Sequence, residues 1–131
     1  MSFWRSPVIL MVELKEDPVS KCVFCDIIGK KLKATFIHED PRAVAFKDVN
    51  PKAPTHVLVV PRRHLASLSQ ATESDEGLLG HLQLLAANLA RQLGIISGFR
   101  LVANNGRGAG QTVDHLHYHL LGGRPMQWPP G

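Results

Sequence analysis

The chain has 131 residues, and 44% of them are hydrophobic, a size and composition that predict one globular domain. Its 15 lysines and arginines outnumber its 11 acidic residues, and the formal charge of +4 suits an anionic ligand. The basic residues form no long run and aromatic residues make up only 6%, so we expect no nucleic-acid surface. No apolar stretch approaches the roughly 18 residues of a membrane helix, so we expect no membrane association.

The sequence predicts an arm followed by a folded domain. Residues 1–20 mix charged residues and prolines without periodicity, which predicts a flexible N-terminal arm. Residues 21–131 are expected to form the domain. Its first element is a short helix over 23–31 that ends at Gly29 or shortly after it.

Three strands are predicted in the first half of the domain. Two short ones lie over 35–38 and 43–48, and turn-forming residues separate them. The third covers the continuous apolar run over 56–60. A run of this kind is typical of a central strand that is covered on both faces.

The longest predicted helix comes next. Thr72 and Asp75 have the spacing of an N-terminal capping box, and Gly94 is expected to end the helix. Between these points leucines recur at helical spacing, at Leu78, Leu82, Leu85, Leu89 and Leu93. Two further strands are predicted over 99–104 and 115–121. This order of elements predicts an α+β fold with a mainly antiparallel sheet.

Three histidines alternate along the last predicted strand, at His115, His117 and His119. Alternate side chains of a strand share one face, so the three imidazoles should point the same way. The residues between and after them should face the core: Leu116, Tyr118 and Leu120. Two kinds of chemistry remain open for such a row. Neutral imidazoles could bind a transition metal, or one could attack an electrophile while its neighbours donate hydrogen bonds.

A glycine-rich loop over 105–110 precedes this strand and continues into Gln111 and Thr112. Glycines allow backbone N–H groups to converge on a phosphate, and the amide and hydroxyl side chains would add neutral donors. A glycine-rich stretch alone is more often a connector. Next to the histidine row it predicts a phosphate site with a nucleophile beside it.

Cys22 and Cys25 form a Cys-x-x-Cys pair, which is consistent with half of a zinc site. Two free thiols and a redox pair are the alternatives. A small secreted protein would usually carry more cysteines, so we expect a reducing compartment and a cytoplasmic location. His64 and His81 have the appearance of ordinary surface residues.

These motifs together resemble the histidine triad (HIT) superfamily. The resemblance rests on Gly110-Gln111-Thr112 followed by the three alternating histidines. Further matching segments are Phe46-Lys47-Asp48, the stretch from Pro54 to Pro61, Asn104, and the ending from Gly122 to Gly131. The ending points to the histidine triad nucleotide-binding (Hint) branch rather than the branch that cleaves dinucleoside polyphosphates.

The resemblance implies a HIT-like fold, with a five-stranded, mainly antiparallel sheet and two helices. It also implies a homodimer in which two sheets join into a continuous ten-stranded sheet. The implied activity is hydrolysis of purine nucleoside phosphoramidates or acyl-adenylates through a nucleotidyl-histidine intermediate. Two alternatives stay open, a dinucleoside polyphosphate hydrolase and a nucleotide-binding regulatory module with vestigial activity.

The resemblance also implies roles for single residues. His117 would become nucleotidylated, and His119 would contact the α-phosphate. Gly110, Gln111 and Thr112 would line the phosphate pocket, with Thr112 standing where many relatives carry serine. Asp48, Val49 and Asn104 would lie at the ribose and base end of the nucleotide.

A structural zinc site is the second implication of the resemblance. Many bacterial and archaeal members of the superfamily complete a Cys-x-x-Cys pair with two histidines. In this chain those would be His56 and His115, which with Cys22 and Cys25 would form a closed tetrahedral site. Such a site would brace the strand that carries His117 without taking part in the chemistry.

Overall fold

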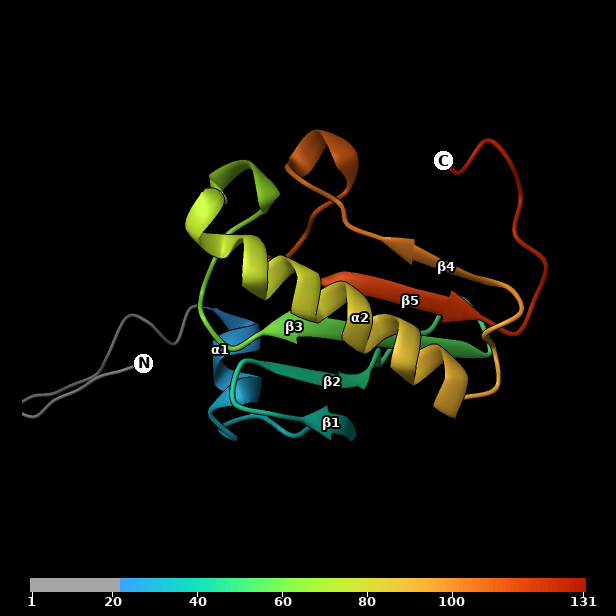
Figure 1. The fold of residues 1–131 in the computed structure, drawn as a ribbon, viewed down its shortest axis with the longest axis horizontal. Coiled ribbons are helices and arrows are strands. Elements are labelled where there is room, and N and C mark those ends of the chain that lie inside the picture. The colour runs from blue at the N-terminus through green and yellow to red at the C-terminus, as the bar shows by residue number, and fades with distance from the viewer. Residues whose placement is uncertain (1–21) are drawn as a thin grey trace, which may run out of the picture.

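The computed structural model describes residues 22–131, so the predicted arm over 1–20 lies outside the described residues. In the described part, one antiparallel sheet has the strand order β1-β2-β3-β5-β4 (Figure 1). The strands are β1 (Phe36–Glu39), β2 (Ala43–Lys47), β3 (Thr55–Pro61), β4 (Phe99–Val102) and β5 (Tyr118–Gly122). The α-helices are α1 (Val23–Ile28) and α2 (Glu76–Gln92). The predicted α+β fold is confirmed.

The centre of the sheet is covered on both faces, as the apolar run in β3 predicts. Val57 and Val59 belong to the core cluster beneath α2, whereas Leu58 and Val60 belong to the cluster beneath α1. The alternation follows from the strand geometry, which sends successive side chains to opposite faces. Each helix therefore has its own face of the sheet, and the two faces can carry different chemistry.

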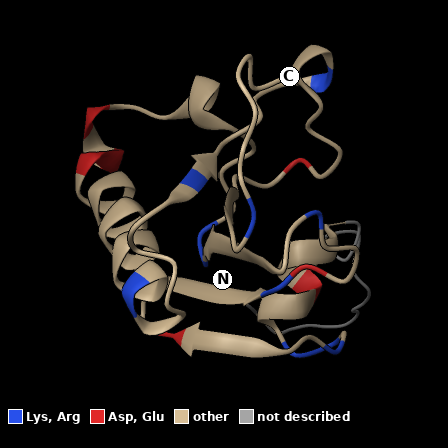
Figure 2. Ribbon diagram, turned by 90° about the vertical axis from the view of Figure 1, so that its right-hand side faces the viewer, with Lys and Arg blue, Asp and Glu red and all other residues tan. Residues whose placement is uncertain are grey.

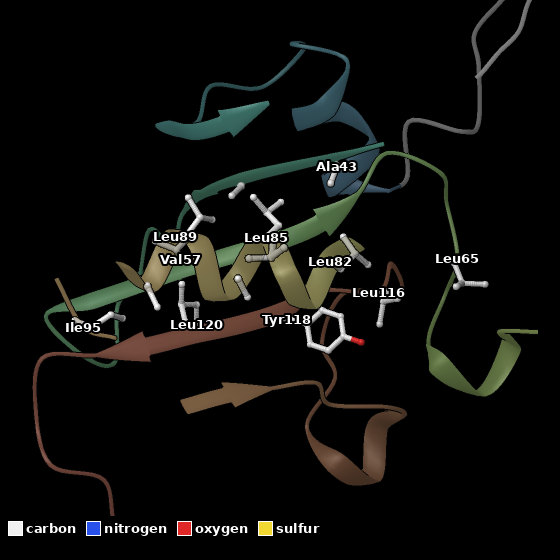
Figure 3. Packing of buried hydrophobic residues seen from close by; sticks show 14 residues of the cluster. Ala43, Val57, Leu65, Leu82, Leu85, Leu89, Ile95, Leu116, Tyr118 and Leu120 are labelled. Carbon is white, nitrogen blue, oxygen red and sulfur yellow. The ribbon is translucent and has the colours of Figure 1, made fainter. Parts of the chain in front are cut away.

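Helix α2 forms as its sequence predicts. A short 3₁₀ turn (Glu73–Asp75) leads into it, and Thr72 and Asp75 form the predicted capping box. The helix buries Leu82, Leu85 and Leu89 against the sheet (Figure 3). Acidic residues lie at its start and Arg91 near its end, an order that complements the helix dipole (Figure 2). Among residues 22–131, no helix is both long and apolar enough to cross a membrane.

Strand β5 begins later than predicted, at Tyr118 rather than His115. The last ladder pair with β3 joins Val59 to Tyr118, and β3 ends at Pro61, which has no N–H to donate. The preceding residues are held by other bonds. The N–H of Leu116 donates to the carbonyl of Leu65 (2.6 Å), and the His115 ring bonds the Pro61 carbonyl (2.8 Å).

Candidate functional site

The three alternating histidines lie on one face of the molecule, as predicted. The rings of His115 and His117 pack against Phe24 of α1, with centroids 6.0 and 4.9 Å away. The ring centroid of His119 lies 5.0 Å from that of His117. The intervening residues pack in the opposite cluster beneath α2: Leu116, Tyr118 and Leu120. The row of imidazoles therefore lies on the α1 face of the sheet.

His117 is buried and has a defined hydrogen-bond partner. Its Nδ1 lies 2.7 Å from the backbone carbonyl of His115. A carbonyl can only accept, so in the neutral ring Nδ1 carries the proton and Nε2 keeps its lone pair. Burial lowers the pKa of His117, which favours the neutral form. The structure thus presents a neutral imidazole with one nucleophilic nitrogen.

His119 pairs with a histidine from the neighbouring strand β3. Its Nδ1 lies 2.9 Å from Nε2 of His56, which also lies 3.4 Å from a carboxylate oxygen of Asp48. Burial is the main cause that lowers the pKa of both histidines, and it lowers the pKa of His119 to about 4. Both rings are therefore neutral near pH 7. Asp48, His56 and His119 form a compact polar group beside His117, which we call the relay group.

The position of His56 corrects the expected set of metal ligands. His56 lies in the relay group, whereas Cys22, Cys25 and His115 gather with His64. We call this second set the thiol cluster. His64 lies three residues after the end of β3, and His115 lies three residues before the start of β5. Because the two strands pair antiparallel, these strand ends meet at the same end of the sheet, beside α1 (Figure 1). His64 is exposed, as expected of a surface residue, but its ring nitrogen also lies within ligand distance of the other three side chains.

The dimensions of the thiol cluster fit a zinc ion. His115 Nδ1 lies 3.4 and 3.6 Å from the sulfurs of Cys22 and Cys25. His64 Nδ1 lies 3.4 Å from the Cys25 sulfur and 3.1 Å from His115 Nδ1. A tetrahedral zinc with ordinary bond lengths places its sulfur and nitrogen ligands about 3.5 Å apart and two nitrogens about 3.3 Å apart. The four side chains could close around the ion with small shifts.

The hydrogen bonding of His115 also suits a metal ligand. Its Nε2 bonds the Pro61 carbonyl, so the proton lies on Nε2 and the Nδ1 lone pair faces the thiols. Metal-bound histidines usually donate their other N–H in this way. Burial, followed by the Cys22 side chain, raises the pKa of Cys25 to about 12, so a metal must displace the thiol protons. A pocket of about 780 Å³, lined among others by Cys25, His64 and Thr112, opens beside the cluster.

The structure corrects the expected role of Gln111. Its side chain is buried, and its amide group donates to the carbonyls of Ala66 (2.7 Å) and Val113 (2.9 Å). Its carbonyl oxygen accepts from the N–H of Gly106 (2.8 Å). The side chain therefore braces the glycine-rich loop from inside and has no donor left for a phosphate. Sequence reasoning missed this role because an amide next to glycines gives no signal of its direction.

The other expected residues of the nucleotide site differ in conformation and exposure. Gly110 has a φ of 91°, a left-handed conformation that favours glycine, and Thr112 is exposed. Val49 is 95% exposed. Asn104 is half-buried after β4, and its neighbour Asn105, which sequence reasoning missed, accepts from the N–H of Leu68 (2.8 Å). Asn105 thus ties the loop after β4 to the segment after β3.

Comparison with known proteins identifies the family to which this arrangement of fold and histidines belongs. The fold and site define a small α+β protein with a histidine-based centre on one face of an antiparallel sheet. The model of the HIT domain family matches residues 29–126. An uncharacterised HIT-like protein of Synechocystis sp. is 55% identical over 83% of this chain and 96% of its own length. The chain belongs to the HIT domain family.

Solved structures agree with this assignment. A HIT family hydrolase from Legionella pneumophila superposes with a TM-score of 0.83 and 44% identity, covering 84% of this chain and 99% of that one. A zinc-bound histidine triad family protein from Mycobacterium smegmatis has a TM-score of 0.70 and 30% identity. That match covers 80% of this chain and 76% of the mycobacterial one. The predicted five-stranded HIT-like fold is therefore confirmed.

Proposed function

We propose that this chain is a hydrolase that cleaves the P–N or acyl-phosphate bond of adenosine or guanosine 5′-monophosphate derivatives. The observation that carries the proposal is the bond from His117 Nδ1 to a backbone carbonyl, which leaves Nε2 with its lone pair. A neutral imidazole with a free lone pair is a good nucleophile near neutral pH. The hydrolase named among the structural relatives supports the reaction class.

The reaction proceeds in two displacements at the α-phosphorus. His117 Nε2 attacks first: a bond from Nε2 to phosphorus forms, the bond to the leaving group breaks, and a leaving amine takes up a proton from solvent. Water then attacks the same phosphorus and gives up a proton to solvent, the bond from phosphorus to Nε2 breaks, its electron pair returns to Nε2, and the nucleoside 5′-monophosphate is released. Splitting the transfer into two steps lets a histidine replace the activated water that a direct attack would need.

The groups around His117 stabilise the charge that develops on the phosphate. His119, one ring away from the nucleophile, donates a hydrogen bond to an α-phosphate oxygen. The exposed hydroxyl of Thr112 donates on the side of the leaving group. Gly110 and Gln111 shape the loop between them. His119 and Thr112 are neutral donors, so the site binds the anion through hydrogen bonds rather than ion pairs.

The nucleoside end of the substrate lies beyond the relay group. Asp48 follows β2 and accepts from the N–H of Asn50 (2.8 Å), which orients its carboxylate for the ribose hydroxyls. The exposed side chain of Val49 offers an apolar surface to the purine. Asn104 completes this end. The resemblance of the ending from Gly122 to Gly131 supports the nucleotide-binding (Hint) branch, and the proposed location is cytoplasmic.

The thiol cluster is proposed to hold a structural zinc ion. Its spacing and the orientation of His115 support this role, as does the zinc-bound relative from Mycobacterium smegmatis. The ion would fix the segment from His115 to His117 relative to α1 and β3. His117 takes its orienting bond from the His115 carbonyl, so the cluster positions the nucleophile without touching the substrate.

A homodimer is proposed for the assembly. β4 lies at the edge of the sheet, where its outer backbone groups can pair with another strand, and Leu84 on α2 is an apolar side chain that is 68% exposed. Pairing of two β4 edges would join the sheets into ten strands. Sedimentation or light scattering should give twice the mass of the chain, and a monomer at micromolar concentration would contradict the dimer.

The experiment that tests the function is hydrolysis of adenosine 5′-phosphoramidate to AMP. The wild-type protein should turn it over, and mass spectrometry of the quenched reaction should reveal a covalent nucleotidyl adduct. His117→Ala should lose both the turnover and the adduct while it still binds AMP. Normal turnover by His117→Ala would refute the assignment. A strong preference for a dinucleoside polyphosphate over the phosphoramidate would favour the alternative hydrolase.

A further inference from the structure

His56 is held from both sides of its ring. Its Nδ1 lies 3.0 Å from the backbone N–H of Lys52, in the loop that joins β2 to β3. Its Nε2 faces His119 and, at a longer distance, Asp48. An amide N–H can only donate, so Nδ1 of His56 accepts. In the neutral ring, the single proton must then lie on Nε2.

This proton position determines what His119 does. The proton on His56 Nε2 is donated to Nδ1 of His119, 2.9 Å away. Nδ1 of His119 then accepts, and the proton of the neutral His119 ring lies on its Nε2. His56 and His119 therefore take the same tautomer, with the proton on Nε2, and the backbone N–H of Lys52 determines both.

The loop around Lys52 is built to hold that amide in place. Pro51 and Pro54 flank it and restrict its backbone. The guanidinium of Arg124 donates from Nε to the carbonyl of Lys52 (3.0 Å). Gly123 passes so close to the Pro54 ring that an added Cβ would lie 2.9 Å from the Cβ of Pro54. The segment after β5 thus clamps the loop that orients His56.

The same amide decides whether the relay group can bind a metal. The ligand atoms of Asp48, His56 and His119 lie within 4.8 Å of one another, close enough to surround one ion. A metal on His56 Nε2 would need the lone pair of that nitrogen, which would move the ring proton to Nδ1. There it would face the N–H of Lys52. Metal-bound histidines instead present their other nitrogen to an acceptor.

We propose that the backbone N–H of Lys52 is a positioning group that fixes the tautomers of His56 and His119 and closes the relay group to transition metals. The thiol cluster is the reverse case, because the carbonyl of Pro61 leaves the Nδ1 lone pair of His115 free. Zinc is thereby directed to the cluster and kept away from the substrate site.

The direct test is the nitrogen NMR spectrum of the histidine rings in the wild-type protein near neutral pH. We expect the Nδ1 resonance of His56 in the range of an unprotonated nitrogen and its Nε2 in the range of a protonated one. Added zinc should leave the ring signals of His56 and His119 in place. A protonated Nδ1 on His56, or a zinc-dependent shift of His56 and His119, would overturn the proposal without the use of any variant.

Two substitutions at one position sharpen the test. Lys52→Pro removes the N–H, whereas Lys52→Ala keeps it and removes only the side chain. Lys52→Pro should mix the tautomers of His56 and make its ring signals respond to zinc, and Lys52→Ala should match the wild type. An unchanged spectrum in a folded Lys52→Pro protein would contradict the inference. If that variant does not fold, the wild-type spectrum and zinc titration decide.

An activity measurement adds a readout that rests on the proposed function. With adenosine 5′-phosphoramidate, Lys52→Pro should lower kcat by about tenfold or more and change KM little, because His119 loses its fixed donor direction. Lys52→Ala should keep the wild-type kcat. Equal kcat values in the two folded variants would remove the link to catalysis. Absence of any hydrolysis by the wild type would remove the proposed function, and the NMR spectra would still decide the tautomer.

Discussion

The thiol cluster and the relay group are both built from histidines of the β3 and β5 region, yet they suit opposite tasks. In the cluster, His115 gives its N–H to the Pro61 carbonyl and offers a lone pair to a metal. In the relay group, His56 accepts a hydrogen bond from the backbone N–H of Lys52 and donates one to His119. The spacing of ligand atoms would allow a metal in either group. The atom on the far side of each ring therefore determines its chemistry.

The largest expected effect comes from breaking the thiol cluster. His64→Ala should abolish tight zinc binding, whereas His56→Leu should leave the zinc content unchanged. At a free zinc concentration a thousandfold above the dissociation constant, the lost binding corresponds to about 4 kcal/mol of unfolding free energy. Metal analysis and denaturant unfolding, with and without a chelator, measure both quantities. Equal zinc content in the wild type and His64→Ala would contradict the assignment of ligands.

The comparison also separates what the sequence could predict from what it could not. Strand alternation correctly predicted that the three triad histidines share one face, although β5 itself begins only at Tyr118, and the leucine spacing with Thr72 and Gly94 predicted α2. These are local patterns, and each follows from the period of one element. The exchange of His56 for His64 is not local. It depends on where β3 ends relative to the start of β5, and on the neighbours of each ring.

The roles of several single residues were equally hard to predict. The sequence places Gln111 beside a phosphate loop but gives no sign that its amide turns inward to Ala66 and Val113. Lys52 would be read as a surface lysine, since its important atom is a backbone nitrogen. His64 offered one usable signal. His64 follows the end of β3, and His115 precedes the start of β5, the antiparallel partner of β3. Antiparallel pairing brings these two strand ends together, which is consistent with the observed contact between the two rings.

The second prediction breaks the relay group and spares the cluster. His56→Leu removes the donor to His119 and should lower kcat for a nucleoside phosphoramidate by about 10²-fold, in the range of a lost acid–base contact. His56→Gln keeps a side-chain N–H at the place of Nε2 and should lose less. Steady-state kinetics with zinc content as the control measure the effect. Comparable kcat values for His56→Leu and the wild type would mean that His119 needs no partner.

A third prediction uses pH to compare the two groups in the metal-free protein. Burial lowers the pKa of His115 and of His119 to about 4, against an ordinary value near 6.5. Between these values the unfolded chain binds more protons than the folded one, so protonation favours unfolding. The free energy of unfolding should therefore be nearly constant between pH 6.5 and about 8, below the range in which unfolded thiols ionise, and should decrease as the pH is lowered towards 4.

Denaturant unfolding at several pH values with a chelator present measures this slope. His119→Gln should flatten it, because one of the buried rings no longer titrates. Zinc should protect the protein at the upper end of the range, where the bound ion still competes with protons for His115. A stability that rises as the pH falls from 6.5 to 5 would show that the rings gain a partner on protonation, in conflict with their burial.

The smallest effect is expected at a third histidine pair, in which a carboxylate is the shared partner. Asp40 accepts from Nε2 of His38 (2.7 Å) and of His81 on α2 (2.8 Å), and also from the backbone N–H groups of Arg42 and Ala43. Burial alone would raise the pKa of Asp40, but these donors outweigh it and hold the pKa well below its usual range. The carboxylate is therefore ionised at neutral pH and accepts only.

His81→Leu removes one of these four donors and loosens the contact between α2 and the turn before β2. The other three remain, and His81 is partly exposed, so the loss should be about 1 kcal/mol or less. His81→Gln keeps a side-chain N–H and should lie closer to the wild type. Thermal unfolding separates the two variants, while zinc content and kcat should match the wild type in both. A change in either would mean that this pair is coupled to the catalytic face. We expect none, because the imidazole of His81 only donates a hydrogen bond to Asp40.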